Sequence, residues 1–317
     1  MTRSLPVLGL PAPTQVELEF TNRCNARCTA CPRTDMPGYG QMTLAVLRQI
    51  LSLYAQYRHP LTAARPRLVI AGGGEPLLHP HAVELLRLCH ASGLHVTLIS
   101  NASRFHKVDL DAVLANVDQL LVSFWGIEPV EYESAMKLDF ECSLKNVERA
   151  SAIAAACGTQ IAVQWLRTAH LRSDADSIWR FWAQRGIFDV RGGDVVWNRA
   201  GALEGIEVEL DRSESLTPDF DRPVWCSDLF FSDSWGCSGE LVLCCCDYFT
   251  SGQTRLGHCS TLTHREIASA KQELLDQFRA TKCAKCKLPR RYRAVQLAED
   301  VLARLPIAEQ RVLMYAS

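Results

Sequence analysis

Three cysteines stand close together near the start of the chain, in the segment TNRCNARCTACPR. They are Cys24, Cys28 and Cys31, and their spacing is C-x3-C-x2-C. Cysteine thiolates bind zinc and iron–sulfur clusters, and both kinds of centre usually have four protein ligands. The next histidine in the chain is His59 and the next cysteine is Cys89, so the motif has no fourth ligand nearby. The spacing therefore predicts a metal centre that keeps one position open.

The whole chain has the composition of a globular protein with one large domain or two ordinary ones. It has 317 residues, of which 48% are hydrophobic, and its net charge is -1. A charge this small creates no overall field for nucleic acid, and no apolar run is long enough to span a bilayer or act as a signal peptide. We expect a cytoplasmic protein with no nucleic-acid or membrane partner. Because the cytosol keeps thiols reduced, the 14 cysteines indicate metal ligation rather than a disulfide framework.

Strand-like and helix-like segments alternate along the first part of the chain. Parallel strands need long crossover connections, so this alternation predicts an α/β fold, a partial (βα)6 TIM-like barrel over residues 1–200. Ligands of such sheets bind beyond the carboxyl ends of the strands, and the three-cysteine motif directly follows the first strand. The predicted strands are 16–20, 68–71, 96–100, 120–124, 161–165 and 190–197. The predicted helices are 43–57, 81–92, 107–116, 141–157 and 174–185.

The alternation stops near residue 198, so we place a linker and a smaller C-terminal unit at 201–317. Within this unit we expect a hairpin over 230–243 and a helix over 264–279. The linker is acidic between 204 and 221. Carboxylates there are candidates for binding a polycationic substrate through charge-assisted hydrogen bonds, although acidic runs are more often solvated surface.

The sequence GGGEP follows the second predicted strand and spans residues 72–76. Together with the three-cysteine motif after the first strand, it resembles the radical S-adenosylmethionine (SAM) superfamily. The resemblance implies that the three thiolates bind three irons of a [4Fe-4S] cluster, while SAM takes the fourth iron and yields a 5′-deoxyadenosyl radical. It implies an external one-electron reductant such as flavodoxin or ferredoxin. The implied SAM contacts are Gly73, Gly74, Glu75, Ser100, Asn101 and Ser123.

From the residues alone, simpler interpretations remain open for these positions. A zinc knuckle is the alternative for the three cysteines. Ser100, Asn101 and Ser123 follow predicted strands, where capping of the next helix is an equally good explanation.

A second group of cysteines begins at Cys226. Gly239 is followed after four residues by Cys244, in the pattern of the SPASM/twitch extension of the same superfamily. The resemblance implies a twitch-type domain with one auxiliary [4Fe-4S] cluster, for two clusters in all. Its implied ligands are Cys226, Cys244, Cys283 and Cys286. A zinc ribbon is the alternative, and Cys245 or Cys246 could replace Cys244.

Members of this subfamily that act on aminoglycosides or aminocyclitols suggest the reaction. The leading prediction is an epimerase of a sugar carbon in an aminoglycoside-like small molecule, with hydrogen returned from a cysteine thiol. Cys259 is the first candidate for that thiol, with Cys245 and Cys246 after it, and a small buried apolar residue is the simpler explanation for Cys259. The alternatives are a dehydrogenase of a cyclitol or sugar alcohol that uses the auxiliary cluster, an enzyme that modifies a ribosomal peptide (RiPP), or a zinc protein that binds nucleic acid.

Overall fold

The computed structural model describes residues 12–32, 39–60, 63–168, 170–193, 224–226, 231–245, 255–276 and 291–293. The strands of its main sheet are β1 (Gln15–Glu19), β2 (Arg67–Ala71), β3 (Val96–Ser100), β4 (Gln119–Ser123), β5 (Gln160–Leu166), β6 (Asp189–Gly193), β8 (Ser232–Trp235), β9 (Glu240–Val242) and β10 (Arg255–His258). Their order across the sheet is β10-β9-β8-β1-β2-β3-β4-β5-β6. Strands β1 to β6 are parallel, which confirms the predicted α/β fold with its parallel sheet.

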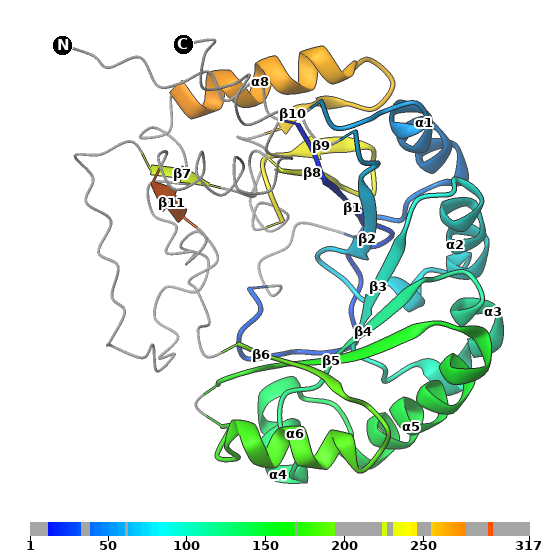
Figure 1. The fold of residues 1–317 in the computed structure, drawn as a ribbon, viewed down its shortest axis with the longest axis vertical. Helices are drawn as coiled ribbons and strands as arrows, with labels where there is room; N and C mark the ends of the chain where they lie inside the picture. The colour runs from blue at the N-terminus through cyan, green and yellow to red at the C-terminus, as the bar shows by residue number, and fades with distance from the viewer. Residues whose placement is uncertain are drawn as a thin grey trace.

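Helices connect the parallel strands and cover one side of the sheet. They are α1 (Leu44–Tyr54), α2 (Ala82–Ala91), α3 (Leu110–Leu114), α4 (Pro129–Met136), α5 (Phe140–Cys157) and α6 (Ala175–Ala183), with short 3-10 turns η2 (Pro76–Leu78) and η3 (Phe105–Lys107). Figure 1 shows the sheet curved like a crescent, with these helices on its convex side. The five predicted helices are present, and α4 is an additional one.

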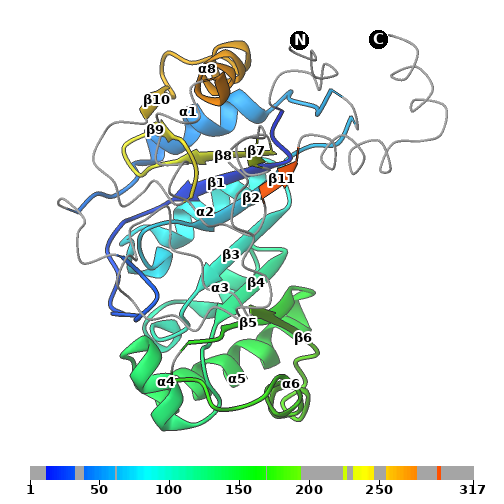
Figure 2. The same cartoon turned by 90° about the vertical axis from the view of Figure 1, so that its left-hand side faces the viewer.

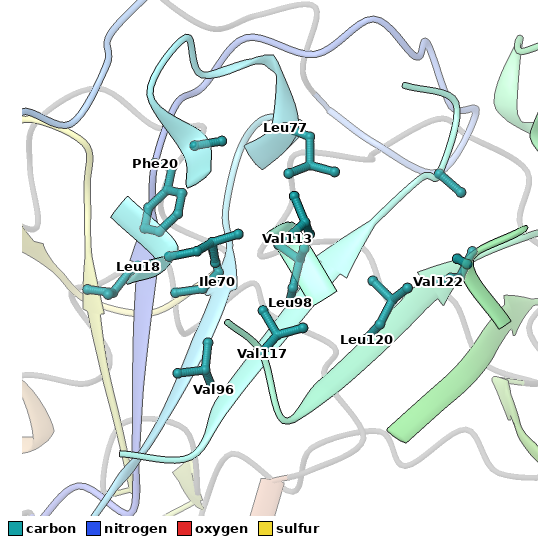
Figure 3. Close-up of a cluster of buried hydrophobic side chains, with 14 of the residues drawn as sticks. Leu18, Phe20, Ile70, Leu77, Val96, Leu98, Val113, Val117, Leu120 and Val122 are labelled. Carbon is teal, nitrogen blue, oxygen red and sulfur yellow. The ribbon is translucent and has the colours of Figure 1, made fainter. Parts of the chain in front are cut away.

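Side-chain alternation along the strands builds the core between the sheet and the helices. Leu18, Ile70, Leu98 and Leu120 are fully buried on this convex side, and Figure 3 shows them in one cluster with side chains from the loops and α3. Successive strand residues point to opposite faces, so the positions between them face the concave side. The concave side of the crescent is therefore the one left for polar groups.

Local capping explains where several helices begin. The side chains of Thr43, Asp109, Asp139 and Asp174 each accept a hydrogen bond from a backbone N–H in the first turn of the helix that follows. The prediction missed α4 because its apolar positions, Tyr132 among them, do not repeat over enough turns to form a clear helical pattern.

The C-terminal hairpin joins the barrel sheet directly. Strand β8 pairs in parallel with β1, and β9 and β10 continue the sheet with antiparallel pairing. Figure 2 shows β8 lying alongside β1, at the end of the sheet opposite β6. The predicted hairpin is confirmed, as is the helix up to Asp276, where α8 (His264–Asp276) ends. The division at residue 200 stays a prediction, since 194–223 lies outside the described residues.

A buried ion pair fastens α8 to the sheet. Lys271 of α8 contacts the carboxylate of Asp233 and donates to the carbonyl of Ser232 at 2.6 Å, and both charged side chains are at most 1% exposed. Asp233 also accepts from the hydroxyl of Tyr54 at 2.7 Å, and the indole of Trp235 donates to that hydroxyl at 3.0 Å. These contacts join α1, β8 and α8 into one unit.

A second, smaller pair of strands lies apart from the main sheet. Strand β7 (Val224–Cys226) is antiparallel to β11 (Arg291–Arg293), and Cys226 is opposite Arg291. Among the residues described, no helix is both long enough and apolar enough to cross a membrane.

Candidate functional site

The three-cysteine loop, residues 24–31, follows the carboxyl end of β1 and is held by the end of α4. The backbone N–H of Arg27 donates to the carbonyl of Met136 at 3.3 Å, and that of Thr29 donates to the carbonyl of Ala135 at 2.9 Å. The last carbonyls of a helix have no partner within the helix, so they are available for such bonds. Helix α4, which the sequence did not predict, therefore positions the loop.

The three thiols are partly exposed and none is in a disulfide. The sulfur of Cys24 accepts a hydrogen bond from the N–H of Ala26 at 3.4 Å and from the side-chain amide of Asn101 at 3.9 Å. Accessible thiols with N–H donors aimed at a sulfur suit an iron–sulfur cluster, since such hydrogen bonds stabilise its thiolate ligands. Within the described residues, no three Cys, His, Asp or Glu side chains already stand in a metal-binding arrangement.

The GGGEP loop, residues 72–76, is fastened to the three-cysteine loop through the chain that leads into it. The N–H of Glu75 donates to the carbonyl of Arg23 at 2.7 Å. A Cβ atom on Gly74 would lie 2.3 Å from the carbonyl oxygens of both Thr21 and Arg23, a distance that no real contact tolerates. Glycine is therefore required for the two loops to approach this closely.

The carboxylate of Glu75 is buried at the centre of the site, with 2% of the residue exposed. It accepts from the hydroxyl of Ser100 and the N–H of Asn101, each at 2.8 Å, and from the N–H of Leu77 at 3.3 Å. Burial raises the pKa of Glu75 above its usual value, although these hydrogen bonds oppose the shift. The carboxylate thus joins the loops that follow β2 and β3.

The structure brings most of the predicted SAM contacts together and leaves one apart. Gly73, Gly74 and Glu75 lie in the loop after β2, Ser100 ends β3 and Asn101 follows it, and the Glu75 carboxylate links the two segments. Ser123 lies at the end of β4, partly exposed, and is paired in register with Gln164 of β5. The contacts of these residues with SAM stay predictions.

Glu19 is a site residue that the sequence analysis did not single out. Its carboxylate, 4% exposed, accepts from the N–H of Gly73 at 2.7 Å and from the N–H of Cys237 at 3.4 Å. Burial raises the pKa of Glu19. The available signal was the alternation VELEF in β1, which places Glu17 and Glu19 on the face opposite the apolar core.

Cys259, the predicted hydrogen donor, is packed between the C-terminal strands and α1. Its thiol donates to the side-chain oxygen of Gln49 at 3.3 Å, and its N–H donates to the carbonyl of Gly239 at 2.8 Å. Burial raises the pKa of the Cys259 thiol, which keeps it protonated.

Cys244 and Cys245 follow β9 and are partly buried. Among the other predicted residues, Cys246, Cys283, Cys286 and the acidic segment 204–221 lie outside the described residues, as does the side chain of Cys226.

Polar side chains line the concave side of the sheet near the carboxyl ends of β4, β5 and β6. The register places Ser123 beside Gln164 and Gln164 beside Arg191. Arg191 is exposed and pairs with Asp189 at 2.6 Å. These groups can donate and accept hydrogen bonds at the same end of the strands as the two loops.

Residues 18–161 match the family model described as the radical SAM superfamily, and this range contains both loops. The match supports the assignment of the chain to that superfamily. A curated relative, GTP 3',8-cyclase of Chlorobaculum tepidum, is 29% identical over 138 residues, which are 42% of this chain and 40% of the relative. The chain thus aligns with less than half of that protein.

Solved structures support the fold over most of the chain. A crystal structure of BtrN in complex with AdoMet and 2-DOIA has a TM-score of 0.56 and 14% identity, covering 87% of this chain and 94% of BtrN. Streptococcus suis SuiB bound to the precursor peptide SuiA has a TM-score of 0.63 and 12% identity, covering 87% of this chain and 70% of SuiB. At these identities the likeness shows the α/β fold that the chain shares with them.

Proposed function

We propose that this chain is a radical SAM enzyme, with a [4Fe-4S] cluster on Cys24, Cys28 and Cys31 and SAM bound against the GGGEP loop. The observation that carries the proposal is the 2.7 Å hydrogen bond between Glu75 and Arg23, which fastens this loop to the three-cysteine loop. A ligand held by one loop then adjoins the thiolates of the other. The family match over 18–161 supports the same assignment.

The residues of the chain hold and orient these groups. When bound, the cluster and SAM supply a 5′-deoxyadenosyl radical that removes a hydrogen atom from the substrate. The N–H of Ala26 and the amide of Asn101 donate toward the Cys24 sulfur and orient it as a cluster ligand. The glycines of the GGGEP loop let the backbone approach the methionine part of SAM closely.

The substrate that we favour is a small, hydroxyl-rich molecule of the aminoglycoside type. Ser123 and Gln164 offer uncharged hydrogen-bonding groups on the concave side, and a sugar presents many donors and acceptors to such a surface. The proposed reaction is epimerisation at a sugar carbon, with hydrogen returned from a thiol. Cys259 stays the first candidate from the sequence for that thiol, and the structure buries its S–H against Gln49 of α1, whereas the second candidate, Cys245, is partly exposed after β9.

Two other reactions fit the same radical chemistry. A dehydrogenase would remove an electron and a proton from the substrate radical. An auxiliary cluster would accept that electron. A peptide-modifying enzyme is the other alternative, because SuiB has this fold and binds a precursor peptide. Reaction in D2O separates the epimerase from the dehydrogenase: an epimerised product carries deuterium from the exchanged thiol, whereas an oxidised product has lost two hydrogens.

We also propose an auxiliary [4Fe-4S] cluster on Cys226, Cys244, Cys283 and Cys286. The pairing of β7 with β11 supports this ligand set, because it places Cys226 opposite Arg291, five positions after Cys286 in the chain. The pairing brings the strand that carries Cys226 beside residues 291–293, which follow Cys283 and Cys286 in the chain.

The first test is the metal content of protein purified without oxygen. About eight irons and eight sulfides per chain indicate two clusters, and about four irons with one zinc indicate the SAM cluster alone. Cys28→Ala should lose about four irons and all reductive cleavage of SAM, while Cys157→Ala, which removes an exposed thiol at the end of α5, should keep both. Zinc without iron would contradict the proposed function.

A further inference from the structure

We propose that Glu19 is a positioning residue for SAM binding: its carboxylate fixes the Gly72–Gly73 peptide and ties it to the turn between β8 and β9. This inference rests on the proposed function, because it concerns the loop that binds SAM there. It adds a residue of β1 to a site built from the loops after the strands.

The geometry at Gly73 sets the orientation of the peptide. The N–H of Gly73 points at one carboxylate oxygen of Glu19, 2.7 Å away. The chain has no cis peptide among the residues described, and in a trans peptide the N–H and the preceding carbonyl point in opposite directions. The carbonyl of Gly72 must therefore point away from Glu19. A carbonyl held in a fixed direction is a ready acceptor for an ammonium group such as that of SAM.

The backbone at Gly72 is shaped around the Glu19 side chain. A Cβ atom on Gly72 would lie 2.7 Å from the Cβ and 2.8 Å from the Cγ of Glu19. Gly72 also has a φ of 114°, which side chains of L-residues rarely allow. The loop therefore turns directly over Glu19, and its conformation depends on both residues.

The second carboxylate oxygen connects this loop to the C-terminal hairpin. It accepts from the N–H of Cys237 at 3.4 Å, and the Cys237 thiol also contacts the carboxylate. Cys237 is buried against Gly40, where an added Cβ would lie 2.4 Å from its sulfur. A buried carboxylate is costly unless its oxygens are hydrogen-bonded, so an apolar side chain would be the cheaper choice for packing alone. The carboxylate of Glu19 is explained by the two N–H groups, of Gly73 and Cys237, that it accepts from.

The experiment measures SAM binding by equilibrium dialysis, using the reconstituted full chain without oxygen. Glu19→Ala should weaken binding by about tenfold to a hundredfold, the effect of losing a hydrogen bond to a charged group. Glu19→Gln keeps an oxygen that can accept from Gly73, so it should lie between this variant and the wild type. Glu17→Ala is the matched control, since Glu17 is two residues earlier on the same face and contacts Gln15 and Ser234 instead.

If the role of Glu19 were purely structural, its loss would lower the iron content and the free energy of unfolding in proportion to SAM binding. Iron content and the free energy of unfolding are therefore measured together with SAM binding. We expect the iron content of Glu19→Gln to be unchanged, and its KM for SAM in reductive cleavage to rise while the rate at saturating SAM stays within about threefold. Hydrogen exchange of the segment 68–78 should be faster in Glu19→Gln even without SAM, which gives a readout if Glu19→Ala does not fold.

The outcomes separate the two proposals. A wild-type protein that carries its clusters and does not bind SAM contradicts the proposed function. A wild type that binds SAM, with Glu19 variants that bind it equally well and show unchanged exchange at 68–78, overturns the role of Glu19 alone.

Discussion

Gly74 lies where the GGGEP loop crosses the chain that leads into the three-cysteine loop, and the absence of a side chain lets these segments meet. We expect Gly74→Ala to destabilise the protein by about 3 kcal/mol, the upper range for overpacking, because the added carbon would meet two backbone carbonyls at 2.3 Å. SAM binding should be lost. The control is Gly158→Ala, where no atom lies within 4 Å and only left-handed strain of about 1 kcal/mol applies. Iron analysis, SAM binding and urea unfolding of both variants would test this, and SAM binding by Gly74→Ala would contradict it.

Glu131 is another buried carboxylate, and its pKa is shifted in the opposite direction to that of Glu75. Burial raises the pKa of Glu131, but hydrogen bonds from the N–H groups of Arg172, Ser173 and Ile127 and from the Ser173 hydroxyl outweigh this and leave it below the usual value. A depressed carboxyl pKa stabilises the folded state above the unfolded pKa of 4.5, and this contribution is lost as the pH falls through the folded pKa.

Glu131→Gln should therefore lower the free energy of unfolding by about 2 kcal/mol at pH 7, the scale of hydrogen bonds to a charged group. Below the folded pKa of Glu131 the difference from the wild type should shrink, because the wild-type carboxyl is then neutral as well. Urea unfolding at a series of pH values from 7 downward measures the difference. A difference that stays constant with pH would show that the charge of Glu131 does not matter.

At the scale of elements, the ion pair of Lys271 and Asp233 holds α8, β8 and α1 together. Lys271→Met leaves the Asp233 carboxylate buried with its hydrogen bond from Tyr54 only, so we expect the free energy of unfolding to fall by about 3–5 kcal/mol. Adding Asp233→Asn should recover part of that loss, because the buried charge is then removed. Tyr54→Phe is the milder control, at about 1 kcal/mol. Urea unfolding of the wild type, Lys271→Met, Asp233→Asn, their double variant and Tyr54→Phe tests the pair, and a double variant whose loss equals the sum of the two single losses would show that the two charges do not interact.

The elements also show what could be predicted from the sequence. Strands β1 to β6 and most helices were predicted because buried parallel strands read as short apolar runs between helical patterns. Helix α4 was missed, and so was the pairing of β8 with β1, which joins residues such as Glu17 and Ser234 that are 217 positions apart. Local patterns carry no information about such partners. The three-cysteine motif was visible because its spacing lies within one loop, whereas Glu19 acts through contacts with two distant segments.

At the scale of the whole molecule, the packed core lies apart from the proposed cluster site. The core lies between the sheet and the helices, and the buried pair of Lys271 and Asp233 fastens α8. The three-cysteine loop lies beyond the carboxyl end of β1. The described part of the fold is therefore large enough to remain folded without metal, unlike a small zinc domain that has no core of its own.

We therefore expect removal of iron, by oxidation and chelation, to abolish SAM binding while leaving the far-ultraviolet circular dichroism of the parallel sheet and helices close to that of the holoprotein. The free energy of unfolding should fall, because a ligand that binds only the folded state stabilises it by mass action. Reconstitution with iron and sulfide should restore binding without a refolding step. A large loss of helical signal in the apoprotein would contradict this, and would mean that the three-cysteine loop and the end of α4 need the cluster in order to fold.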